Sequence, residues 1–140
     1  MRAVVLLSLL LCAVAARGGA GALPTEFVAE FEVLAGGVRV ADTRWTMSSP
    51  RDGHYRYEAR SESTGLLAFV RSDSRVERSE GIIRNGRLRP NEYYYDRHRG
   101  DKRRQVRVRF DWQEGVAANS LGNDTWKMPI PGNALDKLSY

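Results

Sequence analysis

Two histidines, His54 and His98, are the side chains of this sequence best suited to metal binding or acid–base chemistry. A zinc site needs three or four ligands drawn from cysteine, histidine and carboxylate. The single cysteine, Cys12, lies close to the N-terminus, and the two histidines are too far apart in sequence to form a ligand pair on one helix. The Gly-x-Ser-x-Gly pattern that positions a nucleophilic serine is also missing from the sequence. We therefore predict no catalytic residues, no metal site and no cofactor.

The densest cluster of charge is a run of arginines and a lysine over residues 97–109, with aromatic residues on both sides. Basic and aromatic residues together are typical of single-stranded nucleic-acid binding. Alternation within the run favours another interpretation, because Arg103, Arg107 and Arg109 share one face of a strand and valines share the other. We interpret that face first as solvated and second as a contact for an anionic group of a lipid or polysaccharide. Nucleic acid is not an expected partner.

Aromatic side chains are the remaining candidates for a binding site. They either form the core or line an apolar cavity, and the core is the favoured interpretation because a chain of this size needs nearly every large side chain inside. The candidate ligand-binding residues are Trp45, Tyr55, Tyr57, Phe69 and Trp112.

The first 22 residues have the pattern of a secretory signal peptide: Met1-Arg2, then an apolar run over residues 3–16, then small residues. Cleavage is expected after Ala22, with Ala15 as the alternative. The run is short for a helix that spans a bilayer, so no transmembrane anchor is expected after cleavage. Cys12 follows a leucine within the apolar run, which argues against a lipoprotein. We predict a bacterial protein that is periplasmic or secreted, with a net charge of +3 once Arg2 and Arg17 are removed.

The chain beyond residue 22 consists mainly of short segments in which apolar and polar residues alternate. This period of two, with turn signals about every ten to twelve residues, is typical of an antiparallel β-meander. Asn85-Gly86 predicts a two-residue hairpin turn, Pro90 is expected at a sheet edge or strand start, and residues 65–70 form either a short helix or a crossing segment. The predicted strands span residues 27–33, 38–47, 54–60, 72–80, 92–97, 103–112 and 116–120. Residues 134–140 resemble the first turns of a helix.

Several of these pieces occur in an order that resembles one known family. They are Leu23-Pro24 with the alternating strand after it, Arg87-Leu88-Arg89-Pro90, Phe110-Asp111-Trp112, Trp126-x-Met128-Pro129 and Asp136-x-Leu138-Ser139-Tyr140. The sequence is similar to the bacterial domain of unknown function 3108 family, which consists of exported, β-rich envelope proteins with no assigned activity. The resemblance covers nearly all of the chain beyond residue 22 and implies a domain that normally continues for roughly another hundred residues. It therefore implies a single domain, residues 23–140, truncated at its C-terminus.

The fold we expect is mainly β: a bent antiparallel meander sheet, similar to a half-barrel, with a short C-terminal helix start and a signal peptide before it. We expect an envelope protein, not an enzyme, that binds an apolar or amphiphilic ligand such as a lipid on its concave face. The alternative is a structural or interaction module that pairs with an envelope protein through an open sheet edge. An envelope hydrolase ranks third, because no nucleophile–base pair is visible in the sequence.

Overall fold

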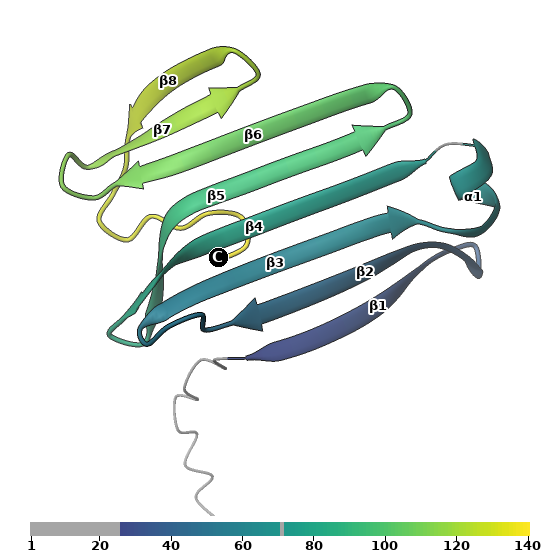
Figure 1. The fold of residues 1–140 in the computed structure, drawn as a ribbon, viewed down its shortest axis with the longest axis horizontal. Coiled ribbons are helices and arrows are strands. Elements are labelled where there is room, and N and C mark those ends of the chain that lie inside the picture. The colour runs from purple at the N-terminus through teal and green to yellow at the C-terminus, as the bar shows by residue number, and fades with distance from the viewer. Residues whose placement is uncertain (1–25, 71) are drawn as a thin grey trace, which may run out of the picture.

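The computed structural model describes residues 26–70 and 72–140, and these form one antiparallel sheet and one short helix (Figure 1). The predicted signal peptide, residues 1–22, lies outside the described residues. The elements are β1 (Phe27–Ala35), β2 (Val38–Ser48), β3 (His54–Ser63), α1 (Gly65–Val70), β4 (Asp73–Arg84), β5 (Arg87–Arg99), β6 (Lys102–Asp111), β7 (Val116–Leu121) and β8 (Asp124–Pro129). Each strand pairs with its neighbour in sequence, so the predicted meander is confirmed. No helix of the described residues is long and apolar enough to cross a membrane.

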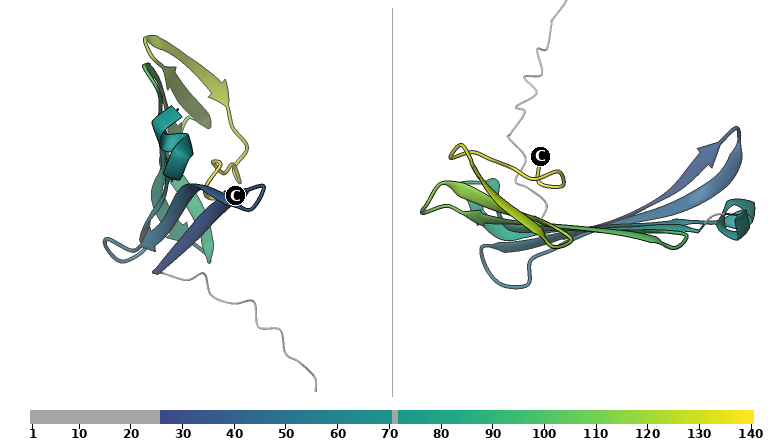
Figure 2. Two further views of the ribbon diagram at one scale, coloured as in Figure 1. Left: turned by 90° about the vertical axis from the view of Figure 1, so that its right-hand side faces the viewer. Right: turned by 90° about the horizontal axis from the view of Figure 1, so that it is seen from above.

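The sheet is bent. Figure 2 shows that the β1 edge and the β8 edge both turn toward the side that carries residues 130–140, which we call the C-terminal segment. Side chains that point to this side form what we call the inner face, and the opposite side is the outer face. Because strand partners share a face, the register places Phe31, Trp45, Tyr57, Tyr93 and Val108 on the inner face. The alternation predicted from the sequence for these strands is confirmed.

Turn residues set the register of the meander. Asn85 and Gly86 have φ values of 53° and 70°, the positive values that a two-residue hairpin turn requires, which confirms the predicted turn between β4 and β5. Asp111 caps a second turn, because its Oδ1 accepts hydrogen bonds from the backbone N–H groups of Gln113 (3.0 Å) and Glu114 (2.9 Å).

Pro90, predicted at a sheet edge or strand start, lies inside β5 at a β-bulge, where it is buried and at a local edge of the sheet. The register shifts between Glu80 and Gly81, so that Gly81 pairs with Pro90 whereas Glu80 pairs with Glu92. Strand β6 pairs with β5 only from Glu92 onward. Pro90 therefore has one neighbouring strand instead of two. The bulge interrupts the hydrogen-bond ladder there, so the N–H that proline lacks is not required.

Three other elements differ from or refine the sequence analysis. Residues 65–70 are the short helix α1, which settles the choice left open between a helix and a crossing segment. Strand β8 is not among the predicted strands, although the Gly122 turn before it marks a hairpin. The predicted helix start at residues 134–140 is wrong in extent: only one turn forms, closed by a bond from the Tyr140 N–H to the Asp136 carbonyl.

Candidate binding groove

The C-terminal segment lies across the inner face and is held there by Asp136. Ser79 Oγ on β4 donates a hydrogen bond of 2.5 Å to Asp136 Oδ2, and Tyr55 OH on β3 lies 2.9 Å from the same Oγ. Since the single hydroxyl proton of Ser79 is used toward Asp136, Tyr55 donates to Ser79. Asp136 Oδ1 also accepts from the N–H groups of Leu138 and Ser139, which caps the final turn. One carboxylate thus joins the segment to two strands.

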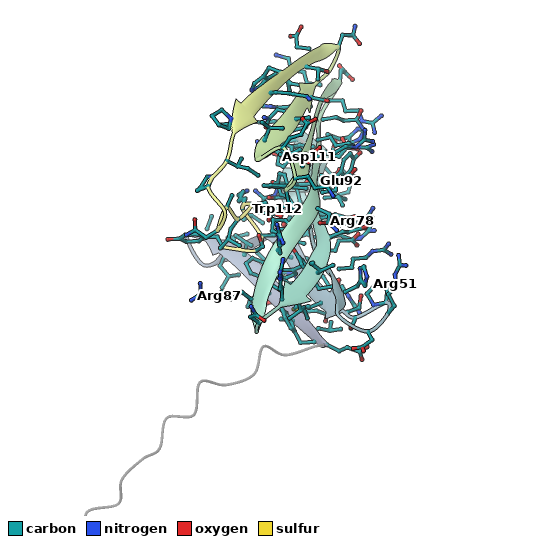
Figure 3. All side chains as sticks on the ribbon, turned by 90° about the vertical axis from the view of Figure 1, so that its left-hand side faces the viewer. Arg51, Arg78, Arg87, Glu92, Asp111 and Trp112 are labelled. Carbon is teal, nitrogen blue, oxygen red and sulfur yellow. The ribbon has the colours of Figure 1, made fainter. Side chains whose placement is uncertain are left out.

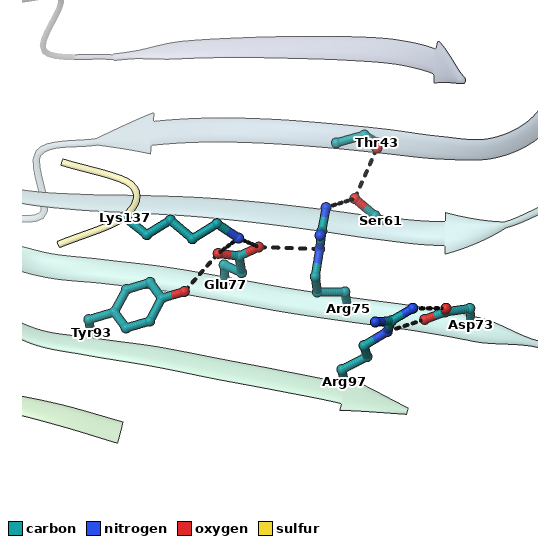
Figure 4. Close-up of polar contacts among 8 residues, drawn as sticks. All are labelled: Thr43, Ser61, Asp73, Arg75, Glu77, Tyr93, Arg97 and Lys137. Carbon is teal, nitrogen blue, oxygen red and sulfur yellow. Dashed lines mark hydrogen bonds and ion pairs between the residues drawn. The ribbon is translucent and has the colours of Figure 1, made fainter. Parts of the chain in front are cut away.

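Glu77 is a second link between the sheet and the segment (Figure 4). Its side chain is 3% exposed, and it accepts hydrogen bonds from Tyr93 OH (2.7 Å) and Lys137 Nζ (2.8 and 2.9 Å), with Arg75 Nε at 3.2 Å. A buried carboxylate is tolerated when donors of this kind surround it. Burial raises the pKa of the Tyr93 hydroxyl well above its usual range, and the neighbouring Glu77 carboxylate raises that pKa further.

A groove of about 1130 Å³ lies between the C-terminal segment, the β4–β5 hairpin and the adjoining end of strands β1, β2 and β3. Its volume is slightly above the usual range for small-molecule sites, about 300–1,000 Å³. The apolar part of its wall consists of Phe27, Met47, Tyr57, Leu88, Trp112, Leu135 and Leu138. The polar part includes Arg84, Asn85, Arg87, Arg89, Asn133 and Ser139, and no acidic side chain lines the groove among the described residues.

Trp112 is fixed in the wall of this groove by two contacts. Its indole Nε1 donates a hydrogen bond of 2.8 Å to the Pro90 carbonyl, which the bulge of β5 leaves free of β6. The Arg89 guanidinium carbon lies 4.4 Å from the centre of the Trp112 ring, a cation–π contact. Phe110 stacks on the same ring at 5.7 Å. The ring therefore presents a fixed apolar surface beside an arginine.

The candidate ligand-binding aromatics from the sequence occupy different places. Tyr57 and Trp112 line the groove, and Tyr55 is buried beneath the C-terminal segment. Trp45 lies on the inner face beside Tyr57, at a ring distance of 5.9 Å, but outside the groove. Phe69 belongs to α1 at the opposite end of the sheet and is 91% exposed (Figure 1). The structure thus brings Tyr57 and Trp112 to one groove, places Trp45 beside Tyr57, and separates Phe69 from all of them.

The candidate anion-contact arginines lie on the outer face, away from the groove. Arg103 forms a bidentate pair with Asp96 at 3.1 and 2.7 Å, and Glu92 lies between Arg107 (3.6 Å) and Arg109 (3.1 Å). The Arg103 guanidinium holds the pKa of the Asp96 carboxyl well below its usual range. Figure 3 shows Glu92 and Arg78 on this side of the sheet and Arg87 on the other. The structure does not bring this arginine set to the inner face.

Sequence reasoning missed the residues that join the segment to the sheet, namely Glu77, Ser79, Asp136 and Lys137. A signal existed, because in the polar strand 72–80 the alternation places Glu77 and Ser79 on the inward side, where apolar residues are expected. The arginines of the groove were missed as well, although Arg84, Arg87 and Arg89 surround the predicted Asn85-Gly86 turn. No cluster of three or more potential metal ligands occurs among residues 26–70 and 72–140.

A family model described as a protein of unknown function (DUF3108) matches residues 30–140. The matched stretch contains every groove residue except Phe27. No curated protein and no solved structure matches the chain.

Proposed function

Because the chain belongs to the DUF3108 family, a family of proteins of unknown function, we propose its function from the groove: the protein binds an apolar or amphiphilic ligand there. The observation that carries the proposal is a groove of about 1130 Å³ with aromatic and aliphatic walls on the inner face. Burial of apolar ligand surface against these walls supplies the affinity, at about 25 cal/mol per Å². The proposed role is that of a binding protein and not of an enzyme.

Exposed apolar residues on the inward side of the sheet and in the groove wall support the proposal. Phe31, Trp126, Met128 and Leu135 are all between 44% and 51% exposed, although alternation places the three strand residues among them on the inward side of the sheet. Large apolar side chains left exposed on this side are available to contact a ligand. A long apolar chain is a ligand that covers such surface beyond the groove itself.

Native mass spectrometry of the protein purified from the cell envelope tests this proposal. We expect a co-purified amphiphile that is released when the protein is denatured. The variant Leu135→Asp places a charge in the groove wall at a position that is 44% exposed, so it should lose the ligand and still fold. The matched control Leu34→Asp changes a leucine that is 59% exposed and does not line the groove, and it should keep the ligand.

A ligand-free mass for the unaltered protein, with no binding of added 1-monolauroylglycerol, would overturn the proposal. Equal loss of ligand in Leu135→Asp and Leu34→Asp would also contradict it, because the groove would then not be the site.

We also propose that the protein is exported to the bacterial envelope. The support is the sequence pattern of residues 1–22, with its basic start, apolar run and small residues. N-terminal sequencing of the protein from the periplasmic fraction should read Leu23-Pro24. A protein that starts at Met1 in the cytoplasmic fraction would contradict export.

The second candidate function is pairing with an envelope protein through β1. Among the described residues, β1 has a neighbour on one side only, and Val28 and Leu34 on it are 58% and 59% exposed. An uncovered edge strand accepts another strand by backbone hydrogen bonding. The variant Val28→p-benzoylphenylalanine should cross-link a partner in the envelope when illuminated, and the same change at Arg104 should not. Absence of any adduct at position 28 would exclude this candidate.

A further inference from the structure

We infer that the hairpin between β4 and β5 is a binding site for the anionic head group of an amphiphile, formed by Arg84, Arg87 and Arg89. The inference rests on the proposed function, because the three arginines bind the charged end of a ligand whose apolar part lies in the groove. The chemical class it selects is a phosphate or carboxylate attached to an acyl or alkyl chain.

The first support is the absence of counter-charge at these arginines. Many arginines of the outer face are paired with carboxylates, as in Arg44 with Glu30 at 2.6 Å and Arg78 with Glu58 at 2.7 Å. Arg84, Arg87 and Arg89 have no carboxylate within 4.0 Å among the described residues. Residues 1–25 and residue 71 contain no aspartate or glutamate either. The groove wall therefore has three positive charges with no acidic side chain of these 140 residues to pair with.

The second support is the arrangement of Arg84 and Arg87. They are direct cross-strand partners on either side of the Asn85-Gly86 turn, and like charges directly opposite each other destabilise a sheet. By comparison, the cross-strand pair Arg44 with Arg60 on the outer face is relieved by carboxylates on both members. At the hairpin the repulsion persists, and an anion between the two guanidinium groups would remove it.

The third support is Arg89. Its Nε atom is buried and has no hydrogen-bond partner among the described residues, and leaving a buried charged donor unpaired is costly. Contact with Trp112 at 4.4 Å holds the guanidinium beside the apolar wall. Arginine binds phosphate and carboxylate with two parallel N–H···O bonds, so a fixed and unpaired guanidinium is suited to such a head group.

The apolar and the charged parts of the groove wall are placed to contact the two ends of one amphiphile. The apolar wall from Phe27, Met47 and Leu138 and the arginine hairpin belong to one continuous groove. Figure 3 shows Arg87 on the side of the C-terminal segment and Arg51, which does not line the groove, on the opposite side. A ligand with one charged end and one apolar end satisfies both parts at once, whereas a fully apolar ligand leaves the arginines unpaired.

The test compares two probes that differ only in a phosphate: 1-lauroyl lysophosphatidic acid and 1-monolauroylglycerol. Both are titrated calorimetrically, below their micelle concentrations, into protein expressed from its complete coding sequence. We expect the phosphate probe to bind at least about tenfold more tightly, the gain expected from one charge-assisted contact. The double variant Arg84→Gln/Arg87→Gln should lose this preference and keep its affinity for 1-monolauroylglycerol.

Arg51→Gln/Arg104→Gln is the matched control. It removes the same charge from two exposed arginines that line no part of the groove and have no carboxylate partner among the described residues, so the phosphate preference should remain. Arg89→Lys keeps the charge and loses the planar fork, and it should reduce the preference only in part. If Arg89→Lys fails to fold, the Arg84/Arg87 comparison still decides the matter.

The outcomes separate the inference from the proposed function. Equal affinity of the protein for the two probes, or equal loss in the groove variant and in the control, would overturn the head-group site and leave groove binding intact. Binding of inorganic phosphate alone, with neither lipid bound, would keep an anion site at the hairpin and overturn the amphiphile. Failure of both lipid probes and of phosphate would overturn both.

Discussion

Glu77 shows how one buried charge connects distant parts of the chain. Its carboxylate accepts from Tyr93 on β5 and from Lys137 in the C-terminal segment, and its own strand is β4. Buried charges of this kind are maintained only while their partners are present, because an unpaired charge in the interior carries the full cost of desolvation. The link is therefore sensitive to loss of any one member.

Replacement of Glu77 by alanine should lower the free energy of unfolding by about 1–3 kcal/mol, because the buried Tyr93 OH loses its acceptor, whereas Lys137, whose side chain is 61% exposed, can be solvated. Urea denaturation measures the effect. The control Glu80→Ala removes a half-exposed carboxylate of the same strand, paired with Arg56 at 2.9 Å, and should cost at most about 1 kcal/mol. Equal losses in the two variants would show that Glu77 is not a structural link.

Two buried tyrosines predict a loss of stability at high pH. Burial raises the pKa of Tyr55 and of Tyr93 above the ordinary value of about 10. A group with a raised pKa in the folded state contributes stability below its unfolded pKa, and that contribution is lost as the pH rises toward the folded pKa. The free energy of unfolding should therefore decrease above about pH 10.

Urea denaturation as a function of pH, together with the ultraviolet absorbance of tyrosinate, checks this expectation. The variant Tyr55→Phe should flatten the alkaline decrease, whereas Tyr140→Phe changes a ring that is 99% exposed and should not. An alkaline decrease of the same slope in Tyr55→Phe and in the unaltered protein would contradict the assignment.

At the scale of elements, the bulge between β4 and β5 shapes the groove. It shifts the register at Gly81, places Pro90 inside β5 and frees the Pro90 carbonyl to accept from Trp112. A Cβ atom on Gly81 would lie 2.1 Å from the Arg89 carbonyl oxygen and 2.8 Å from Pro90 Cα, which only displacement of backbone can relieve. Glycine at this position is therefore what permits the close approach of the two strands.

Gly81→Ala should lower the free energy of unfolding by about 1–3 kcal/mol, the usual cost of forcing an added methyl group into packed structure. It should also weaken ligand binding, because Arg89 and Trp112 depend on the bulge. Chemical denaturation and calorimetry measure the two effects. Gly132→Ala, where an added Cβ meets nothing within 4 Å, is the control and should change stability by less than about 0.5 kcal/mol.

At the scale of the whole molecule, the described residues form a single sheet with one covering segment. Domains usually bury the apolar side of a sheet against a second layer. Here the fully buried apolar residues are few among those described, namely Met47, Tyr55, Ala59, Tyr93 and Ala117. Much of the inner face is left to be covered, and under the proposed function a bound apolar chain would cover part of it.

Ligand binding should therefore stabilise the protein by mass action. At a free concentration of 1-monolauroylglycerol a hundred times its Kd, the free energy of unfolding should rise by about 2.7 kcal/mol. Urea denaturation with and without the lipid measures the shift. Leu135→Asp should abolish it and Leu34→Asp should preserve it; a shift of equal size in both would place the lipid outside the groove.

Much of the sheet could be predicted from the sequence, because alternation and turn residues act over short distances. Four aromatic side chains lie on the predicted inward face: Phe27, Phe31, Tyr55 and Tyr57. The Asn85-Gly86 turn determines its hairpin through local residues alone. Short connections between successive strands then leave little choice but a meander. The sequence by itself thus determined the strand faces and the order of the strands in the sheet.

The groove was decided by the tertiary structure alone. Alternation assigns a side chain to a face but not to an end of the sheet, so it could not separate Phe69, on α1 at one end of the sheet, from Tyr57, which lines the groove at the other. Nor could it tell which arginines find carboxylates, because those pairs form across strands and depend on register. The contact of Asp136 with Ser79 joins residues 57 positions apart. The C-terminal segment, which crosses the inner face, brings such positions together and forms one wall of the groove.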